Sequence, residues 1–218
     1  LMARLKTTTL AERALIPAYV YFFQMLYPFA WVNDPKKTMA GAAGGCMLVQ
    51  RKVLKAAGGI AAIKGALIDD CALGKELKRH GSIWLGLADN VKSLRGYPTW
   101  GEIWRLIARS AFTQLRHSLL LLAVCIIGMA LTFLAPPLLA IQHDLGVRVF
   151  GLVAWALMTL TYLPTLLYFG LPGWWAPLLP LTALFYLAAT IDSARRHLMG
   201  RGGEWKGRLQ AQKQARAR

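Results

Sequence analysis

The segment from Leu119 to Ile191 constrains the fold most, because its only charged residues are Asp144 and Arg148. A soluble surface needs polar groups facing water, so a stretch of this length without them is typical of a membrane region. Each of its apolar runs is long enough for a membrane helix, which takes roughly 20 residues. Buried helices of a soluble bundle are the alternative interpretation. The runs are Leu119–Ile141, Val149–Gly170 and Gly173–Ile191.

Prolines interrupt these runs, at Pro136-Pro137, at Pro164, and at Pro177 and Pro180. Membrane helices tolerate proline where neighbouring groups satisfy the freed carbonyls. The double proline predicts that the first run is the most irregular of the three.

Nearly all of the charge lies outside the membrane region. The chain has 26 Lys and Arg against 10 Asp and Glu, a net charge of +16. Basic residues flank both ends of the region, so the positive-inside rule places both ends in the cytoplasm. Three crossings of the membrane would place the two ends on opposite sides of it. One run must therefore be re-entrant, interfacial or split in two, or the tail must lie outside.

The basic tail, residues 192–218, is expected to be cytoplasmic and to bind anionic lipid headgroups. The high positive charge also raises the possibility of nucleic-acid binding. Lipid charge explains basic residues beside membrane segments more simply, so no nucleic-acid partner is expected.

Residues 14–32 form a second uncharged stretch, rich in aromatic residues and broken by Pro17, Gln24 and Pro28. Aromatic side chains and adjacent basic residues favour the boundary between lipid and water. We predict a membrane-surface or re-entrant element here rather than a crossing helix.

Residues 33–118 are predicted to be the soluble part, with alternating short strands and helices. The pattern predicts a strand at Cys46–Val49, a helix at Lys52–Ala57 closed by two glycines, and a strand within 82–96. A helix is predicted from the apolar stripe that runs through residues 98–118.

Two adjacent carboxylates, Asp69 and Asp70, stand at the start of another predicted helix. Acidic residues there are favoured by the exposed N–H groups, so a structural cap is one interpretation. The other is chemical, because an aspartate beside a glycine-lined surface can take a proton from an alcohol. The glycine pair Gly44-Gly45 lies upstream of the aspartates.

The order "GGCMLVQRKVLKAAGG…LIDDCALGKELKRHG" resembles the acceptor half of a membrane-bound family 2 glycosyltransferase of the GT-A type. With "FFQMLYPFAWVNDP", "ARSAFTQLRHS" and "GGEWKGR", the chain is most similar to the hopene-associated glycosyltransferases, relatives of ceramide glucosyltransferase. The resemblance implies an α/β plus transmembrane α fold. Its parts would be the acceptor half of a GT-A domain (1–118), about three transmembrane or re-entrant helices (119–191) and the tail (192–218).

The resemblance also implies roles for individual residues. Asp70 would be the general base and Asp69 would orient the site. The segment Gly44, Gly45 and Cys46 would lie on the acceptor side. The family's (Q/R)-x-x-R-W signature is degenerate here, since no Trp follows the candidate arginines. Either Arg109 or the stretch containing Gln114, Arg116 and His117 would stand for it and bind the donor diphosphate.

Metal and donor binding are expected elsewhere. No Asp-x-Asp motif occurs in the chain, and the three cysteines have no metal-binding spacing. The resemblance implies that Mg²⁺ or Mn²⁺ and the nucleotide sugar bind to an upstream half. The chain is therefore expected to be a C-terminal piece that is inactive by itself.

The function that these features favour is inverting transfer of a sugar from a nucleotide sugar to a lipid hydroxyl. The lipid would be a hopanoid, another polyisoprenoid or a sphingolipid-like molecule. The protein would be a multi-pass protein of the bacterial inner membrane, with the catalytic part on the cytoplasmic side. The alternative is a non-enzymatic membrane protein, such as a transporter or assembly subunit whose basic faces bind lipid.

Overall fold

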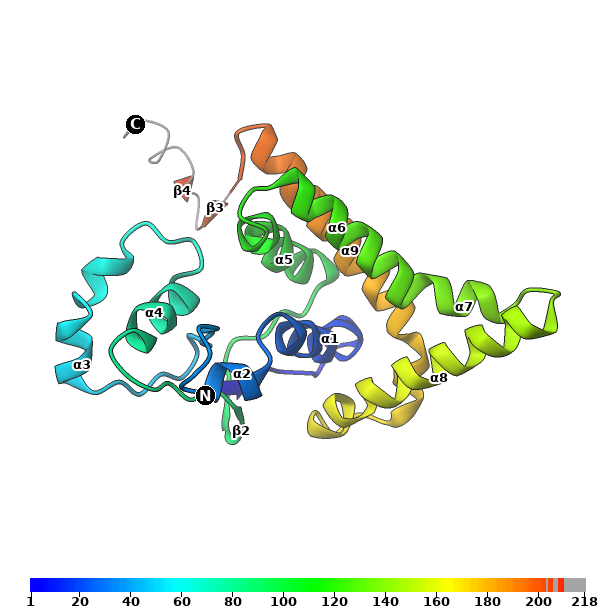
Figure 1. Cartoon of the computed structure of the whole chain (residues 1–218), viewed down its shortest axis with the longest axis horizontal. Helices are drawn as coiled ribbons and strands as arrows, with labels where there is room; N and C mark the ends of the chain where they lie inside the picture. Colours follow the sequence, from blue (N-terminus) through cyan, green and yellow to red (C-terminus); the bar gives the residue numbers. More distant parts are fainter. Residues whose placement is uncertain (203, 206–207, 210–218) are drawn as a thin grey trace. The chain divides into compact units, whose positions relative to one another are not determined.

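The computed structural model describes residues 1–202, 204–205 and 208–209. It divides into two compact units. The first unit comprises residues 1–6 and 22–96, and the second comprises residues 7–21 and the chain from residue 97 onward. Most described residues with regular structure are helical (Figure 1). The basic tail predicted for residues 192–218 extends outside the described residues at 203, 206–207 and 210–218.

The first unit combines a small sheet with short helices. Strands β1 (Met2–Arg4) and β2 (Leu87–Lys92) pair in parallel, with an irregular register between the pairs Met2–Leu87 and Arg4–Lys92. Three of its helices pack around a small core of Ala57, Leu73 and Leu77. They are α3 (Arg51–Ala56), the 3₁₀ helix η1 (Ile60–Ile63) and α4 (Asp69–Lys78), and the unit also contains α2 (Phe29–Asn33).

Three local predictions can be compared with this unit. The helix expected at 52–57 is confirmed as α3, and Gly58 and Gly59 end it with φ of +83° and +68°. The strand expected within 82–96 is confirmed as β2. The strand predicted at Cys46–Val49 is wrong. The Leu1 ammonium group beside β1 donates to the Cys46 carbonyl at 2.9 Å, but no strand is formed at these residues, and Val49 packs on the helical core instead.

The regular structure in the described residues of the second unit is helical apart from the short antiparallel pair β3 (Glu204–Trp205) and β4 (Arg208–Leu209). Helix α1 begins in this unit and its last turn, from Phe22, belongs to the first. The α-helices of the second unit are α1 (Leu10–Leu26), α5 (Trp100–Gln114), α6 (Leu119–Met129), α7 (Ala135–Ala140), α8 (Leu145–Tyr168) and α9 (Leu179–Leu198).

Side chains fix where these helices begin. Thr99 and Glu102 form a reciprocal capping box at α5, and Ser118 and Asp144 cap α6 and α8. Each cap satisfies backbone N–H groups that have no partner within the helix. The helix predicted from the apolar stripe in residues 98–118 is confirmed as α5.

Three helical stretches are long and apolar enough to cross a membrane, namely 119–140, 145–168 and 173–198. They correspond to the three predicted runs. The first is irregular, as the double proline predicts: a π-helical segment, η2 (Ala130–Leu134), separates α6 from α7. Pro136 and Pro137 lack the N–H groups that would continue the regular pattern, and a wider turn accommodates them. A 3₁₀ segment, η3 (Gly173–Leu178), precedes α9.

The described chain is thus mostly helical, with one small parallel sheet, where the sequence predicted an α/β domain followed by membrane helices. Residues 14–32 are divided between α1 and α2, and Pro28 precedes α2. Whether this segment lies at the membrane surface stays a prediction.

Candidate active site

The two aspartates of the first unit occupy the first turn of α4, and their environments differ. Asp70 is half-buried and Asp69 is exposed. The Asp70 carboxylate accepts hydrogen bonds from the N–H of Gly44 at 2.9 Å and from the N–H of Cys71 at 2.7 Å. Asp69 accepts only a local bond, from the N–H of Asp70 at 3.0 Å. Asp70 is therefore the carboxylate with a fixed position.

The position of Asp70 leaves it able to act on a substrate. An ionised carboxylate has about four acceptor positions, and the backbone occupies two of those on Asp70. The remaining positions are available to a substrate hydroxyl. General-base chemistry requires a carboxylate held in a fixed orientation, and the role of Asp70 as the base stays a prediction.

Gly44 approaches Asp70 too closely for a larger residue. A Cβ at Gly44 would lie 3.2 Å from the Asp70 Cβ and 3.3 Å from its Oδ2. A Cβ at Gly74 would similarly lie 3.1 Å from the Cβ of Ala42. The segment 41–44 therefore lies directly against the first two turns of α4. The neighbouring Gly45 has space, since its Cβ would meet only Ala3 at 3.6 Å.

We expect Gly44→Ala to reduce activity more than Gly45→Ala. The new methyl group at position 44 must push Asp70, the predicted base, or the backbone by a few tenths of an ångström, and displacement of a reacting group by such amounts is costly. The measurement is the rate of transfer by the two variants in membranes containing equal amounts of protein. Equal rates for the two variants would show that the Gly44–Asp70 contact does not matter to catalysis.

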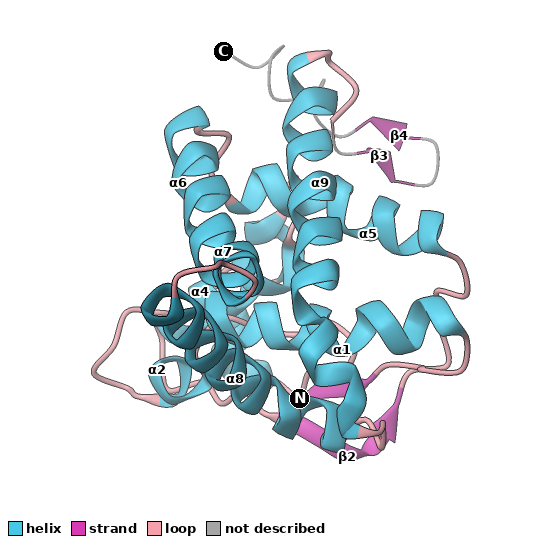
Figure 2. Cartoon of the chain, turned by 90° about the vertical axis from the view of Figure 1, so that its right-hand side faces the viewer, coloured by secondary structure: helices cyan, strands magenta, loops and turns pink. Residues whose placement is uncertain are grey.

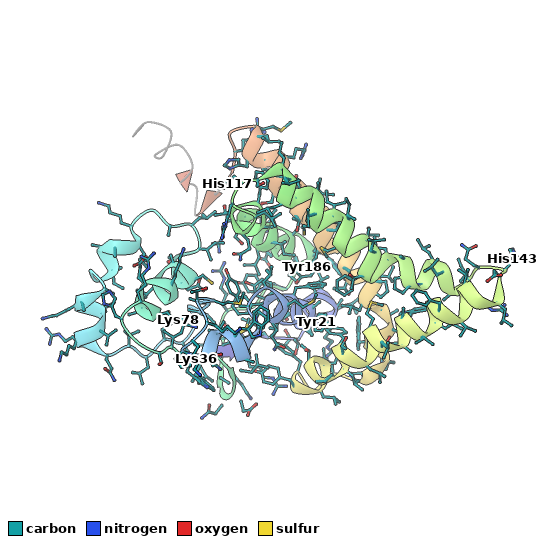
Figure 3. All side chains as sticks on the ribbon, viewed as in Figure 1. Tyr21, Lys36, Lys78, His117, His143 and Tyr186 are labelled. Atoms are coloured by element: carbon teal, nitrogen blue, oxygen red, sulfur yellow. The ribbon has the colours of Figure 1, made fainter. Side chains whose placement is uncertain are left out.

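The other end of α4 is fixed by Lys78, which we did not predict as a site residue. Its ammonium nitrogen lies within hydrogen-bond distance of four backbone carbonyls, which share its three N–H donors: those of Trp31 at 3.3 Å, Val32 at 2.8 Å, Asp34 at 3.1 Å and Met39 at 2.7 Å. Figure 3 labels Lys78 in the first unit. The segment that runs from α2 to the glycines is therefore attached to both ends of α4.

Cys71 also joins α4 to this segment, through a long Sγ hydrogen bond of 3.5 Å to the carbonyl of Ala42. Burial raises the pKa of the Cys71 thiol, and the neighbouring Asp70 charge adds to the rise. A thiol with a raised pKa is a poor nucleophile. Cys46 is a half-buried free thiol in the turn after Gly45.

The remaining predicted site residues lie in the second unit, on α5 and in the turn that follows it. Arg109 and Gln114 are half-buried on α5, whereas Arg116 and His117 are exposed. Arg116 and His117 have φ of +54° and +55°, a left-handed conformation that non-glycine residues rarely adopt. The two candidate positions for the degenerate signature are thus a regular helix and a tight turn.

His117 is held by packing against α9. Its ring stacks on that of His197, with centroids 4.1 Å apart and an interplanar angle of 13°. Its Nε2 lies 3.1 Å from the Thr113 hydroxyl, and Phe112 contacts both rings edge-on. Burial lowers the pKa of His117, and the nearby His197 lowers it further. The contacts made by this side chain are those of a structural residue.

Two buried carboxylates of the second unit were also missed. Asp192 on α9 accepts from the indole N–H of Trp104 at 2.8 Å, and it pairs with Arg195 at 3.0 Å and Arg196 at 2.7 Å. A lone acid followed by two arginines at positions i+3 and i+4 is a sequence signal for such pairs. The cluster joins α5 to α9.

Glu12 is the second buried carboxylate, with an exposed fraction of 1%. It accepts hydrogen bonds from the N–H groups of Thr8, Thr9 and Tyr97 and from the Thr8 hydroxyl. Burial alone raises the pKa of Glu12, but these donors together bring it below its ordinary value. The T-x-x-E spacing from Thr9 is the sequence signal for this cap.

No group of three or more His, Cys, Asp and Glu side chains that could hold a metal ion occurs among the described residues. The expected Mg²⁺ or Mn²⁺ therefore has no matching ligand set in that part of the chain. No step of the mechanism below depends on a metal.

Comparison with known proteins gives one match. A family model described as "Glycosyl transferase family 21" matches residues 25–210, which is most of the 218-residue chain. Neither the curated proteins nor the solved structures yielded a match. The match confirms that the chain is a glycosyltransferase, as predicted, and it shows family 21, whereas the predicted assignment to family 2 is not shown. The matched range includes Asp70 with its glycine segment and all three membrane-length helices. The chain belongs to glycosyl transferase family 21.

Proposed function

We propose that this chain carries the acceptor half of a GT-A glycosyltransferase, which transfers a sugar from a nucleotide sugar to the hydroxyl of a membrane lipid with inversion. The observation that carries the proposal is the fixed half-buried Asp70. Its carboxylate is held by the Gly44 N–H at 2.9 Å, in a glycosyltransferase chain with three membrane-length helices. The membrane helices favour an acceptor that itself resides in the bilayer.

The proposed reaction is a single displacement. Asp70 takes the proton of the lipid hydroxyl as the oxygen attacks the anomeric carbon of the sugar. The bond from that carbon to the diphosphate breaks, and its electron pair leaves with the nucleoside diphosphate. Attack from the face opposite the leaving group inverts the anomeric configuration.

The leaving diphosphate requires positive charge and hydrogen-bond donors. We assign Arg109 and Arg116 to this role, because a guanidinium forms charge-assisted bonds to phosphate oxygens. Gln114 and His117 are secondary candidates from the same helix and turn. His117 is the weaker of the two, since its ring is already stacked on His197. A divalent cation, when bound by the protein, would supply further positive charge at the diphosphate.

We propose that the catalytic part lies on the cytoplasmic side of a bacterial inner membrane, where nucleotide sugars are made. Exposed arginines beside the membrane helices, such as Arg105 and Arg195, suit the anionic headgroups of that side. The acceptor is proposed to be a polyisoprenoid such as a hopanoid, or a sphingolipid-like alcohol.

The test is transfer of labelled sugar into extractable lipid. Membranes containing the whole gene product are incubated with one radiolabelled nucleotide sugar at a time, and matched membranes without the protein serve as the control. We expect label in a lipid fraction for at least one donor, and its loss when the acceptor hydroxyls are acetylated beforehand. If no donor labels any lipid, or if protein alone is labelled, the proposed function is wrong.

A further inference from the structure

The stretch of the second unit from α6 to α9 returns to the place where it starts. The turn before α6 contacts the end of α9, because His117 and His197 stack at 4.1 Å. From there the α6–α7 stretch leads to the exposed turn at residues 141–144, and α8 leads back (Figure 1). His143 marks that turn in Figure 3, at the end of the α7–α8 hairpin. α9 then returns to the starting point.

Helix α5 lies along the second half of α9 and bears charged residues. Trp104 contacts Phe185 at one end of this contact, with ring centroids 5.2 Å apart, and hydrogen-bonds to Asp192. Phe112 donates its N–H to Ser193 and packs on His197. The contacts run from residue 185 to residue 197 of α9, which is about 18 Å of helix. Figure 2 shows α9 between α5 and α6.

α5 is charged, so it cannot lie beside α9 inside the hydrocarbon layer of a membrane. α5 exposes Arg105 and carries Arg109 and Glu102, and charges inside a bilayer are costly. α9 also contacts the first half of α1, where the Tyr186 hydroxyl donates to the Leu15 carbonyl at 2.8 Å and the Thr182 hydroxyl donates to the Ala14 carbonyl at 3.4 Å. The adjacent Arg13 of α1 is exposed. The length of α9 from about residue 182 to its end is therefore near water on one side.

The other side of α9 carries an exposed apolar stripe. The spacing of its residues is three, seven and seven, which places all of them on one face of a helix. They are Leu181, Leu184, Ile191 and Leu198, with exposed fractions of 67%, 50%, 43% and 66%. The exposed Arg195 lies on the same face, near its end. α6 differs from α9, because its residues are apolar on every side of the helix. It is also less covered by the rest of the chain: 11% of the first membrane-length window is buried, against 50% of the window that contains α9.

We propose that α9 does not cross the membrane but lies in its interface, with the apolar stripe against lipid and with α5 on the water side. The α6–α7 stretch and α8 form the inserted hairpin. The chain therefore enters and leaves the bilayer on the same side, which is the arrangement that the basic residues at both ends require. The partner of the stripe is the headgroup and upper acyl region of that leaflet.

The test is a depth profile along α9 in the whole protein, reconstituted in lipid vesicles. The native cysteines are replaced, and a spin label is attached to a single cysteine at each of the four stripe positions in turn. Collision with oxygen and with a water-soluble nickel complex reports depth. We expect all four labels within about 5–10 Å of the headgroup level, as for interfacial helices.

The same profile along α8 is the matched control, at Phe150, Val153, Leu157, Leu160 and Leu167, which are also exposed. Their depths are expected to change along the helix and to pass close to the bilayer centre, about 15 Å from the headgroups. A profile on α9 that likewise descends to the centre and rises on the far side would overturn the proposal. Because the labels replace exposed side chains on both helices, a folding defect would show as altered α8 depths. Loss of sugar transfer in other variants has no bearing on this result.

Discussion

Replacing Asp70 by Asn is expected to lower the rate of sugar transfer by about 10²–10⁴-fold, the usual contribution of a positioned general base. The amide keeps the size of the carboxylate, and its oxygen can still accept the Gly44 N–H bond. It cannot take a proton from an alcohol. The measurement is the initial rate of label transfer into lipid at saturating donor. The KM for the nucleotide sugar is expected to change little, because Asp70 acts on the acceptor.

Asp69→Asn is the matched control for this experiment. Asp69 is exposed and accepts only the local bond from the Asp70 N–H. We expect a loss of less than about tenfold, because the substitution removes a neighbour of the base and not the base. A larger loss for Asp69→Asn than for Asp70→Asn would reverse the two assigned roles. Full activity of Asp70→Asn would rule out the mechanism.

Lys78→Met is expected to release the segment from α2 to Gly44 from α4. Methionine retains the apolar stem, but the four carbonyls lose their common donor. Each unsatisfied carbonyl costs about 1–3 kcal/mol if it stays buried, so the segment should move to water instead. A loss of about 3 kcal/mol in the free energy of local opening corresponds to roughly 100-fold faster exchange of the protected amides in residues 31–46.

Hydrogen exchange followed by mass spectrometry measures this directly, peptide by peptide. Lys75→Met is the control, because Lys75 is exposed on the same helix. It removes the same charge from α4 and should leave exchange in residues 31–46 unchanged. If the two variants exchange alike, Lys78 does not hold the segment. We also expect Lys78→Met to lower transfer activity, since Gly44 and Asp70 are brought together by this packing.

The membrane helices and α5 could be predicted from sequence because periodicity and charge decide them locally. The stripe that included Ile103 and Ile107 predicted α5, and both residues are buried in it. The helix cap at Thr99 lies three residues before Glu102, a spacing visible in the sequence. In these elements, local pattern and tertiary packing agree.

Contacts across long sequence separations could not be predicted in this way. The strand expected at Cys46–Val49 has suitable residues, but a strand requires a ladder of backbone hydrogen bonds. The bond from the Leu1 ammonium group to the Cys46 carbonyl does not extend into such a ladder. The sequence indicates that Lys78 is a solvated residue of a basic helix, because nothing in the sequence shows that four backbone carbonyls surround its ammonium group. The Gly44–Asp70 bond likewise joins residues 26 positions apart. The type of chemistry was visible in the sequence, whereas its supporting contacts were not.

The anomeric configuration of the lipid product tests the central claim most directly. With an α-linked nucleotide sugar as donor, a single displacement assisted by Asp70 must give a β-linked lipid glycoside. The coupling constant of the anomeric proton in the NMR spectrum of the purified product distinguishes the two configurations for a gluco-configured sugar. We predict the β product from the wild-type protein and about 10²–10⁴-fold slower formation of the same product by Asp70→Asn. An α-linked product would contradict the proposed mechanism, because retention requires a different course of reaction.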